Sequence, residues 1–226
     1  PDRLGFFTLA TNSLKMARMS TQSKRSVKPP RVWQRMLSGR RLDLAHPSPV
    51  DIEIEDIAHG LARVARWNGQ TKGGHAFSVA EHSVIVENLC CKLEPGLNPR
   101  DRLTALLHDS PEYVIGDMIS PFKALLGESY KSIEARLQEA IHIRFELATV
   151  TPVRLKKLIK RADHISAWFE AVQLAGFSEA ESNKLFGKPP EGIRLKLKPL
   201  SVPEAQEAFL ARYGQLHNDF EMSKRR

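Results

Sequence analysis

Four side chains of the kinds that bind divalent cations occur on segments that otherwise look like buried helix. His108 and Asp109 follow directly on the apolar run 105–107, and His82 and Asp163 each lie beside a helical stripe of apolar residues. A carboxylate buried without a partner is strongly unfavourable, whereas a divalent cation compensates its charge and also accepts a neutral imidazole. Two imidazoles and two carboxylates suit Mn, Co, Fe, Ni or Mg with coordination positions left open for water. We therefore expect these four residues to bind a catalytic divalent cation.

Each of these residues also has an ordinary structural explanation. His82 alone would be typical of a hydrogen-bonded core histidine, and Asp163, with charged neighbours on both sides, of a solvated helix position. His108 and Asp109 alone could form a polar helix end. The cation hypothesis is more specific than these explanations, because it predicts that all four side chains meet at one point after folding.

The segments that carry these residues have the spacing of amphipathic helices. Apolar residues recur at intervals of three and four, as Val86, Leu89 and Leu93 do. The ranges that follow this pattern are 55–67, 78–93, 99–109, 129–147, 151–176 and 203–220. Strand-like alternation occurs only at 50–55 and 193–198. The predicted fold class is all-α, a single-domain helical bundle with minor irregular or short β segments.

Prolines and capping residues predict where some of these helices begin and end. Thr151 is expected to cap a long helix with Pro152 at its first helical position. Pro111 is incompatible with a continuous helix, because it removes a hydrogen bond and clashes with the preceding turn. We therefore expect a helix end or kink at about Ser110, with Ser110 capping a new turn, and an irregular link over 110–127.

Length and composition favour one globular domain. With 226 residues, of which 42% are hydrophobic, the chain can bury one sizeable core. No run approaches the ~18 apolar residues of a membrane-spanning helix, so no membrane partner is expected. Cys90 and Cys91 are adjacent on a helical segment, where a disulfide between them has poor geometry. Reduced cysteines of this kind predict a cytoplasmic protein.

The formal net charge of +8 is concentrated near the ends of the chain. Residues 1–31 hold seven Lys or Arg and one Asp, and residues 184–198 hold five Lys or Arg and one Glu. The rest of the chain is mildly acidic, which argues against nucleic acid as a partner. We expect a flexible basic leader over 1–30, a helical domain over 31–183, and a C-terminal extension over 184–226 with one helix packing on that domain.

The order and separation of His82, the pair His108-Asp109 and Asp163 resemble the H…HD…D pattern of the HD-domain metal-dependent phosphohydrolases. "HDSPEYVIGDMISPFK" is similar to the HD-x-x-E-x-x-x-x-D-x-x-x-P-x-K block of their 5′-deoxynucleotidase-like branch, as are "RW" before "FSVAEHS" and "KRAD…EA". The resemblance covers roughly residues 40–176. It implies an HD-type helical bundle that binds a divalent metal through these four residues and hydrolyses a phosphomonoester, in particular a nucleoside 5′-monophosphate.

The resemblance also implies roles for further residues. Glu112 would orient or deprotonate the attacking water, and Asp117 would protonate the leaving group or hold the sugar. Arg66 and Lys123 would bind phosphate oxygens, and Trp67 would shape the sugar or base pocket. Simpler explanations stay open: Glu112 as a cap or ion-pair partner, Asp117 as a turn residue, and Arg66 with Trp67 as the end of a helix.

Three other features refine this hypothesis. His75, in the glycine-rich link "GGHAFSV", is a candidate substrate contact in a segment that would fold over the pocket. Two-metal relatives need additional histidines before the final ligand, and only His142 lies in that interval, so we expect one metal. Glu112 is followed by Tyr113 rather than by the second acidic residue of the alarmone hydrolases. This difference argues against bis-phosphorylated substrates.

The sequence leaves more than one function open. The preferred hypothesis is a hydrolase of a small phosphorylated substrate, a nucleotide in particular. A non-catalytic metal- and nucleotide-binding sensor of the same fold, and a hydrolase of another phosphorylated metabolite, are the alternatives. A homodimer is a further option, because members of the family often form one.

Overall fold

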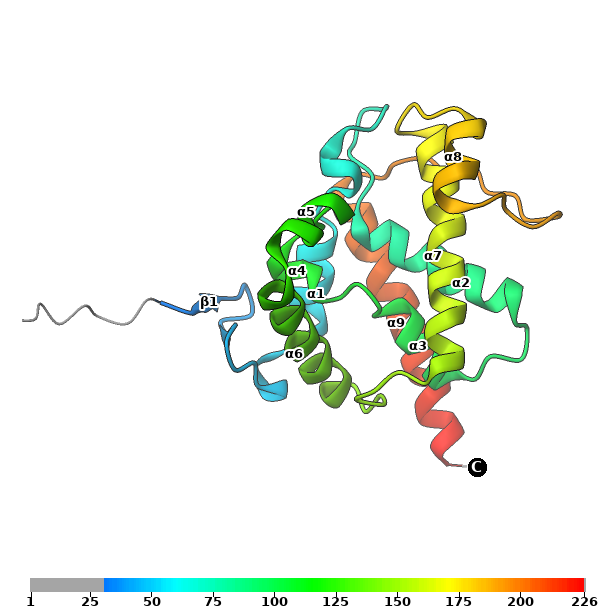
Figure 1. Ribbon diagram of the computed structural model, residues 1–226. Coiled ribbons are helices and arrows are strands. Elements are labelled where there is room, and N and C mark those ends of the chain that lie inside the picture. The colour runs from blue at the N-terminus through cyan, green and yellow to red at the C-terminus, as the bar shows by residue number, and fades with distance from the viewer. Residues whose placement is uncertain (1–30, 226) are drawn as a thin grey trace, which may run out of the picture. The chain divides into compact units, whose positions relative to one another are not determined.

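The structure, a computed structural model, describes residues 31–225 (Figure 1). The compact unit described below begins at Val32. The predicted basic leader, residues 1–30, lies outside the described residues. Within the described part of the chain, no helix is both long and apolar enough to cross a membrane.

Helices make up most of this unit, together with one very small sheet. Strand β1 (Trp33–Arg35) pairs antiparallel with β2 (Arg41–Asp43), and the register places Gln34 opposite Leu42. The helices are, in chain order, η1 (Pro49–Asp51), α1 (Ile54–Leu61), η2 (Arg66–Gly69), α2 (Val79–Leu93), α3 (Pro99–Leu106), α4 (Glu112–Ile115), α5 (Ser120–Leu126), α6 (Glu128–Arg144), α7 (Val153–Gln173), α8 (Glu179–Phe186) and α9 (Val202–Lys224), where η denotes a 3₁₀ helix. The predicted all-α class is confirmed.

Side chains at the helix starts explain where several helices begin. The Ser78 side chain accepts a hydrogen bond from the backbone N–H of Glu81, and the Glu81 carboxylate accepts one from the backbone N–H of Ser78. This capping box starts α2. Asn98 caps α3 immediately before Pro99, and Ser178 opens a second capping box at the start of α8. Local sequence therefore fixes the start of the helix that carries the first predicted ligand.

Of the predicted effects near the prolines, the structure shows the helix break at Pro111 but neither of the two predicted caps. The helix break before Pro111 occurs, since α4 begins only at Glu112. Ser110 does not cap α4, however, because its Oγ is buried and has no hydrogen-bond partner among the described residues. Pro152 lies at the N-cap of α7 in an extended conformation (ψ 141°), and no side chain caps this helix. The predicted Thr151 cap is therefore wrong.

Three other segments differ from the predicted pattern. The predicted irregular link contains the short helices α4 and α5, and the alternating segment 50–55 forms η1 and the start of α1. Residues 193–198 pair with no strand among the described residues. The Gln173 side chain takes the place of a neighbouring strand: its Nε2 donates to the carbonyl of Leu195 (2.9 Å), and its Oε1 accepts from the N–H of Leu197 (3.0 Å).

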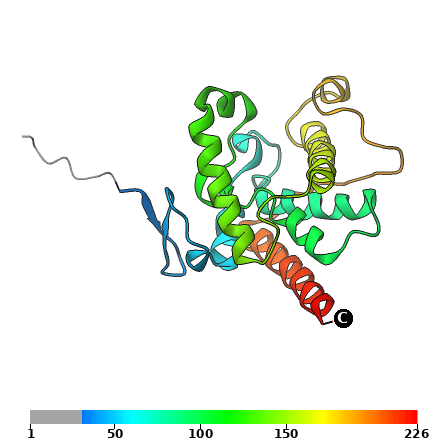
Figure 2. The same ribbon diagram turned by 60° about the horizontal axis from the view of Figure 1, so that its bottom comes forward.

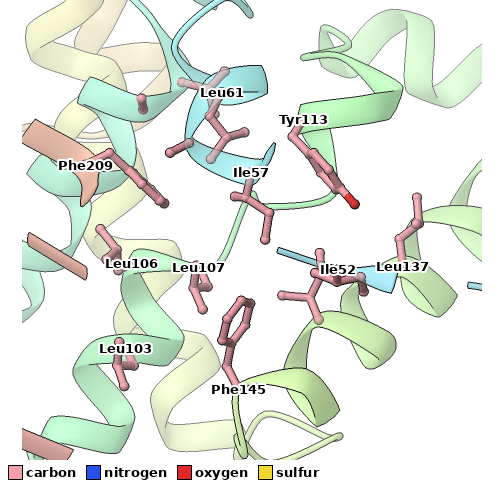
Figure 3. Close-up of a cluster of buried hydrophobic side chains, with 14 of the residues drawn as sticks. Ile52, Ile57, Leu61, Leu103, Leu106, Leu107, Tyr113, Leu137, Phe145 and Phe209 are labelled. Carbon is pink, nitrogen blue, oxygen red and sulfur yellow. The ribbon is translucent and has the colours of Figure 1, made fainter. Parts of the chain in front are cut away.

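Two clusters of buried apolar side chains hold the helices together. The first lies among α1, α3, α4, α6 and α9 and includes Ile57, Leu106, Tyr113, Leu137 and Phe209 (Figure 3). The second joins α2 and α7 and includes Val86, Leu89, Leu155, Ile159 and Phe169. Helices α2 and α7 lie against each other along this second cluster (Figures 1 and 2). This packing brings together the two helices that carry His82 and Asp163.

A buried ion-pair cluster fixes α2 relative to α3 and α9. The Glu87 side chain on α2 is fully buried and accepts hydrogen bonds from Nε of Arg102 (2.8 Å) and Nε of Arg212 (2.7 Å). A buried carboxylate is tolerated here because two guanidinium groups compensate its charge. The cluster therefore holds α2 beside α3. The His108-Asp109 pair lies in the turn that follows α3.

Gly60 lies where α1 packs against α4. A Cβ atom there would lie 2.7 Å from both the Cβ and the carbonyl oxygen of Tyr113, the residue after Glu112. We predict that Gly60→Ala lowers the free energy of unfolding by about 1–3 kcal/mol, because this overpacked contact must open.

Gly214 in α9 provides the matched control, since a Cβ there would meet nothing within 4 Å. Gly214→Ala should raise the free energy of unfolding by roughly 0.5–1 kcal/mol, because alanine favours the helix. Urea unfolding measures both variants. Equal stabilities of the two would contradict the close packing at Gly60.

Candidate metal centre and active site

The four predicted metal ligands come from three parts of the fold and lie close together. His82 is on α2, His108 and Asp109 lie in the turn after α3, and Asp163 is on α7. Nε2 of His82 lies 3.6 Å from Oδ2 of Asp109 and 3.3 Å from Oδ1 of Asp163. Nε2 of His108 lies 3.1 Å from Oδ2 of Asp109. Ligand atoms of His82, His108 and Asp109 all lie within 4.8 Å of one another. We call these four residues the metal cluster; their role as ligands stays a prediction.

The atoms of the metal cluster fit a divalent cation. The Nε2 atoms of His82 and His108 are buried and have no hydrogen-bond partner among the described residues. Neighbouring ligands that each lie about 2.1 Å from one ion are separated by roughly 3 Å, close to the distances given above. A cation between these atoms would therefore explain both their spacing and the two unpartnered nitrogens.

The other ring nitrogen of each histidine faces a hydrogen-bond acceptor. Nδ1 of His108 lies 2.9 Å from the carbonyl oxygen of Ala105, and Nδ1 of His82 lies 2.6 Å from Oε1 of Glu170. A carbonyl oxygen only accepts, so Nδ1 of His108 carries the proton. An ionised Glu170 also only accepts hydrogen bonds, so Nδ1 of His82 carries a proton as well. With a proton on Nδ1 of each ring, Nε2 is the atom that would offer a lone pair to a metal once any proton on it is released.

Glu170 connects the metal cluster to the turn that carries Arg66. Its fully buried side chain accepts hydrogen bonds from Oγ of Ser166 (2.7 Å), Nε of Arg66 (3.1 Å) and Nε1 of Trp67 (2.9 Å), besides its contact with His82. Burial alone would raise the pKa of Glu170, but the charges of Arg66 and His82 outweigh burial and hold this pKa well below its ordinary range. Glu170 is therefore an ionised acceptor in the protein interior.

Glu170 was not among the predicted site residues, although it lies in the "KRAD…EA" stretch. Glu170 follows Asp163 by two helical turns on α7, so both side chains lie on one face of that helix. This spacing was the available signal. It was not recognised because a glutamate on a helix is far more often solvated than buried.

The predicted helical setting of Arg66 and Trp67 is wrong, because α1 already ends at Leu61. Both residues lie in η2, where Trp67 (φ 58°) and Asn68 (φ 50°) have left-handed backbone conformations. Each such conformation in a residue other than glycine costs about 1 kcal/mol or more, so surrounding contacts must hold it.

Those contacts come from Trp67. Its indole N–H donates to Glu170, and its ring packs against Phe177 and Phe186 at centroid distances of 5.6 and 6.0 Å. Arg66 is held in turn, since Nε donates to Glu170 and Nη1 donates to Asp117 (3.2 Å). The remaining N–H groups of the guanidinium are available for an anion.

A hollow of about 340 Å³ opens beside the metal cluster. It is lined by His108, Asp109, Pro111, Glu112, Lys131, Glu134, Ala135 and Gln138, the last four of which belong to α6 and were not predicted from sequence. Glu112 is buried, and its Oε2 has no hydrogen-bond partner among the described residues. Nζ of Lys123 lies 3.5 Å from Oε1 of Glu112 and 3.2 Å from Oε1 of Glu134. Glu112 thus lines the hollow with one carboxyl oxygen that is buried and has no hydrogen-bond partner among the described residues.

Carboxylates outnumber fixed cations around this hollow. Burial and the negative charges of Asp109 and Asp117 raise the pKa of Glu112 to about 9. Burial lowers the pKa of His82, but the surrounding carboxylates outweigh it and raise this pKa to about 10. Both groups hold protons that offset the excess negative charge. A divalent cation would supply the same compensation and release protons on binding.

Two other histidines of the sequence analysis lie apart from the metal cluster. His75 is exposed, and no hydrogen bond or ion pair joins it to the cluster among the described residues; it lies within electrostatic reach of Glu204 on α9. His142 is buried on α6, where its ring nitrogens contact Nε2 of Gln138 (2.7 Å) and the carbonyl oxygen of Ala148 (2.6 Å). The structure therefore gives His142 hydrogen bonds rather than a position in a second metal site.

Comparison with known proteins bears on this arrangement. A model of the 5′-deoxynucleotidase YfbR-like family matches residues 56–215. The match extends beyond residue 176, where the sequence resemblance was thought to end, and includes α8 and much of α9. An uncharacterized protein of Rhodobacter capsulatus is 58% identical over 190 residues, which cover 82% of this chain and 96% of that protein.

A helical bundle that brings together His, His-Asp and Asp side chains defines the HD-domain phosphohydrolase superfamily, and the predicted resemblance to it is confirmed. The chain belongs to the 5′-deoxynucleotidase YfbR-like family of this superfamily, because the family model matches most of its length.

Removing the charge of Glu170 tests how strongly this residue supports the metal cluster. We predict that Glu170→Gln weakens Mn²⁺ binding about 10–100-fold, because the acceptor behind His82 loses its charge and Arg66 loses a partner. Isothermal titration calorimetry at constant pH measures the affinity. Ser166→Ala, which removes only one hydrogen bond to Glu170, should weaken binding less. A folded Glu170→Gln variant with wild-type affinity would contradict the assignment.

Glu112 should make the stability of the metal-free protein depend on pH. Its pKa of about 9 lies above the ordinary value of 4.5, so the folded state binds an extra proton between these two values. The stability that this proton provides is present at low pH and is lost as the pH rises toward 9. Glu112→Gln cannot ionise, and we predict that its free energy of unfolding falls less than that of the wild type between about pH 5 and pH 8.

Denaturant unfolding at several pH values measures this difference. Added Mn²⁺ provides the control, since a bound cation compensates the ionised carboxylate and should reduce the difference between the two proteins. Parallel pH profiles in the metal-free proteins would show that Glu112 ionises normally.

Proposed function

We propose that this protein is a metal-dependent phosphohydrolase whose substrate is a nucleoside 5′-monophosphate. One observation carries the proposal: two buried imidazole nitrogens without hydrogen-bond partners among the described residues lie with the Asp109 carboxylate beside a hollow lined by Glu112, and Asp163 lies 3.3 Å from one of these nitrogens. Membership of the 5′-deoxynucleotidase YfbR-like family supports hydrolysis of a phosphate ester. The same family description supports a nucleotide as the substrate.

A divalent cation bound by His82, His108, Asp109 and Asp163 would supply the positive charge that polarises the phosphoryl group and acidifies a water molecule. Mn, Co, Fe, Ni and Mg all accept this set of ligands. Ala105 and Glu170 hold the Nδ1 side of each ring, so Nε2 of His82 and of His108 would bind the cation after releasing any proton.

Glu112 is the proposed general base. Glu112 lines the hollow, its buried Oε2 has no hydrogen-bond partner among the described residues, and Lys123 contacts the other carboxyl oxygen. The raised pKa of Glu112 is caused by burial and neighbouring negative charge, so a cation at the metal cluster would lower that pKa. A carboxylate with a pKa near the working pH both accepts a proton from water and returns it.

Arg66 and Lys123 are the proposed phosphate-binding residues. Glu170 and Asp117 hold the Arg66 guanidinium from two sides, which leaves its other N–H groups for phosphate oxygens. Asp117 is thereby a positioning group for Arg66, in addition to its proposed contact with the sugar or the leaving group. Trp67 uses its N–H on Glu170, so only its ring is available to shape the substrate pocket.

Two substitutions separate metal binding from turnover. We predict that Asp109→Ala abolishes both Mn²⁺ binding and phosphate release, because it removes a ligand. Glu112→Gln should retain Mn²⁺ binding within about tenfold and lower kcat about a hundredfold or more, because it removes only the proton acceptor. Phosphate release from ribo- and deoxyribonucleoside 5′-monophosphates with Mn²⁺, Co²⁺, Ni²⁺ and Mg²⁺ measures the activity.

Glu207→Gln, at an exposed position of α9, is the control and should behave as the wild type. Wild-type turnover by Asp109→Ala would exclude the proposed metal cluster. If the metal-loaded wild type bound nucleotides but released no phosphate over hours, the protein would be a sensor instead. Phosphate release only from phosphorylated metabolites other than nucleotides would support the phosphohydrolase activity and contradict the nucleotide substrate.

A further inference from the structure

A second hollow, of about 390 Å³, lies between α7 and the residues at and after the end of α8. Its lining residues are Lys157, Lys160, Arg161, His164, Ile165, Phe186, Gly187, Lys188 and Pro190. Four of these side chains are permanently charged cations and none is acidic. We call this region the basic hollow. It shares no residue with the hollow beside the metal cluster.

The four cations of the basic hollow, which are Lys157, Lys160, Arg161 and Lys188, have no ion-pair partner among the described residues. Arg154, on the same helix, does have one, because it pairs with Glu94. Three of the four cations lie at a spacing of three and four residues on α7 and therefore occupy one face of that helix. All four side chains are exposed, so they are accessible to an anion from solvent, which would reduce their mutual repulsion.

The basic hollow is separate from the metal cluster, but a chain of side-chain contacts that begins at one aromatic residue connects the two regions. Phe186 lines the hollow and packs edge-on against Trp67, with 6.0 Å between ring centroids. Trp67 in turn donates to Glu170, which contacts His82. A ligand in the basic hollow would therefore contact Phe186, which also packs against Trp67 of η2.

We propose that the basic hollow binds a small molecule with several adjacent phosphate groups, such as a nucleoside triphosphate or an inorganic polyphosphate. A triphosphate chain carries about as much negative charge as the four cations carry positive charge, whereas a single phosphate would leave about half of it uncompensated. The planar guanidinium of Arg161 suits bidentate phosphate binding. Ile165, Phe186 and Pro190 supply an apolar wall for a further part of the ligand.

The size of the basic hollow favours a small molecule over a nucleic-acid chain. Its volume lies within the range of about 300–1,000 Å³ that is typical of small-ligand pockets. A nucleic-acid site would instead extend as a groove along many phosphates. The proposal does not depend on the proposed function, because none of the lining residues belongs to the metal cluster.

Isothermal titration calorimetry with inorganic tripolyphosphate and with ATP tests this proposal on the full chain. Wild type and Asp109→Ala should both bind tripolyphosphate, because Asp109 does not line the basic hollow. Lys160→Glu/Arg161→Glu should weaken binding at least tenfold. Tighter binding of ATP than of tripolyphosphate would identify a nucleotide, and equal binding would identify the phosphate chain as the recognised group.

Arg35→Glu/Arg100→Glu is the matched control, because it changes the net charge by the same amount at exposed positions on β1 and α3, outside the basic hollow and its helix. It should retain binding within about threefold, since distant surface charges are screened by salt. If Lys160→Glu/Arg161→Glu does not fold by circular dichroism, Lys188→Glu, in the segment after α8, replaces it and should also weaken binding.

Several results would overturn the proposal. Equal losses in the test and control variants would show a general charge effect, and loss of binding only in Asp109→Ala would place the phosphates at the metal cluster. Tighter binding of a single-stranded oligonucleotide than of tripolyphosphate would show that the ligand is a nucleic acid and not a small molecule. Wild-type affinity in folded Lys160→Glu/Arg161→Glu would exclude the basic hollow altogether.

Discussion

The structure around the candidate active site depends on the compensation of buried negative charge. Four carboxyl side chains come close together in the helical bundle: Glu112 and Glu170 are buried, and Asp109 and Asp163 are partly exposed. A buried carboxylate without a partner is strongly destabilising. Only Glu170 has a full set of donors from the protein itself. The others are balanced in part by protons and lysine or arginine side chains. A divalent cation would compensate the remaining negative charge. The same negative charge would attract the cation to the site.

The packing of the bundle determines where these charges meet. Helices α2 and α7 share a core of aliphatic side chains, so their relative position is set by close contacts rather than by loops. Glu87, with Arg102 and Arg212, fixes the other side of α2 against α3 and α9. His82 and Asp163 are therefore held on packed helices before a cation binds, which reduces the ordering entropy that binding would cost.

Part of this arrangement could be predicted from the sequence. Polar residues that interrupt apolar helical stripes are expensive to bury, which is why His82, His108-Asp109 and Asp163 could be recognised as one set. Glu170 was missed because its burial depends on donors from a distant turn. The positions of Arg66 and Trp67 could not be predicted either, since left-handed backbone at Trp67 and Asn68 is held by tertiary contacts and not by local propensity.

Helix α7 carries opposite charges on different faces, and this division has a consequence for anionic ligands. Asp163 and Glu170 face the interior, while Lys157, Lys160 and Arg161 line the basic hollow. Inward carboxylates alone would repel a phosphorylated molecule that approaches from solvent. Unpaired cations close by create a positive potential that offsets this repulsion and raises the local concentration of anions. A single helix therefore carries both the carboxylates at the proposed metal cluster and three of the cations of the basic hollow, which is proposed to bind phosphate.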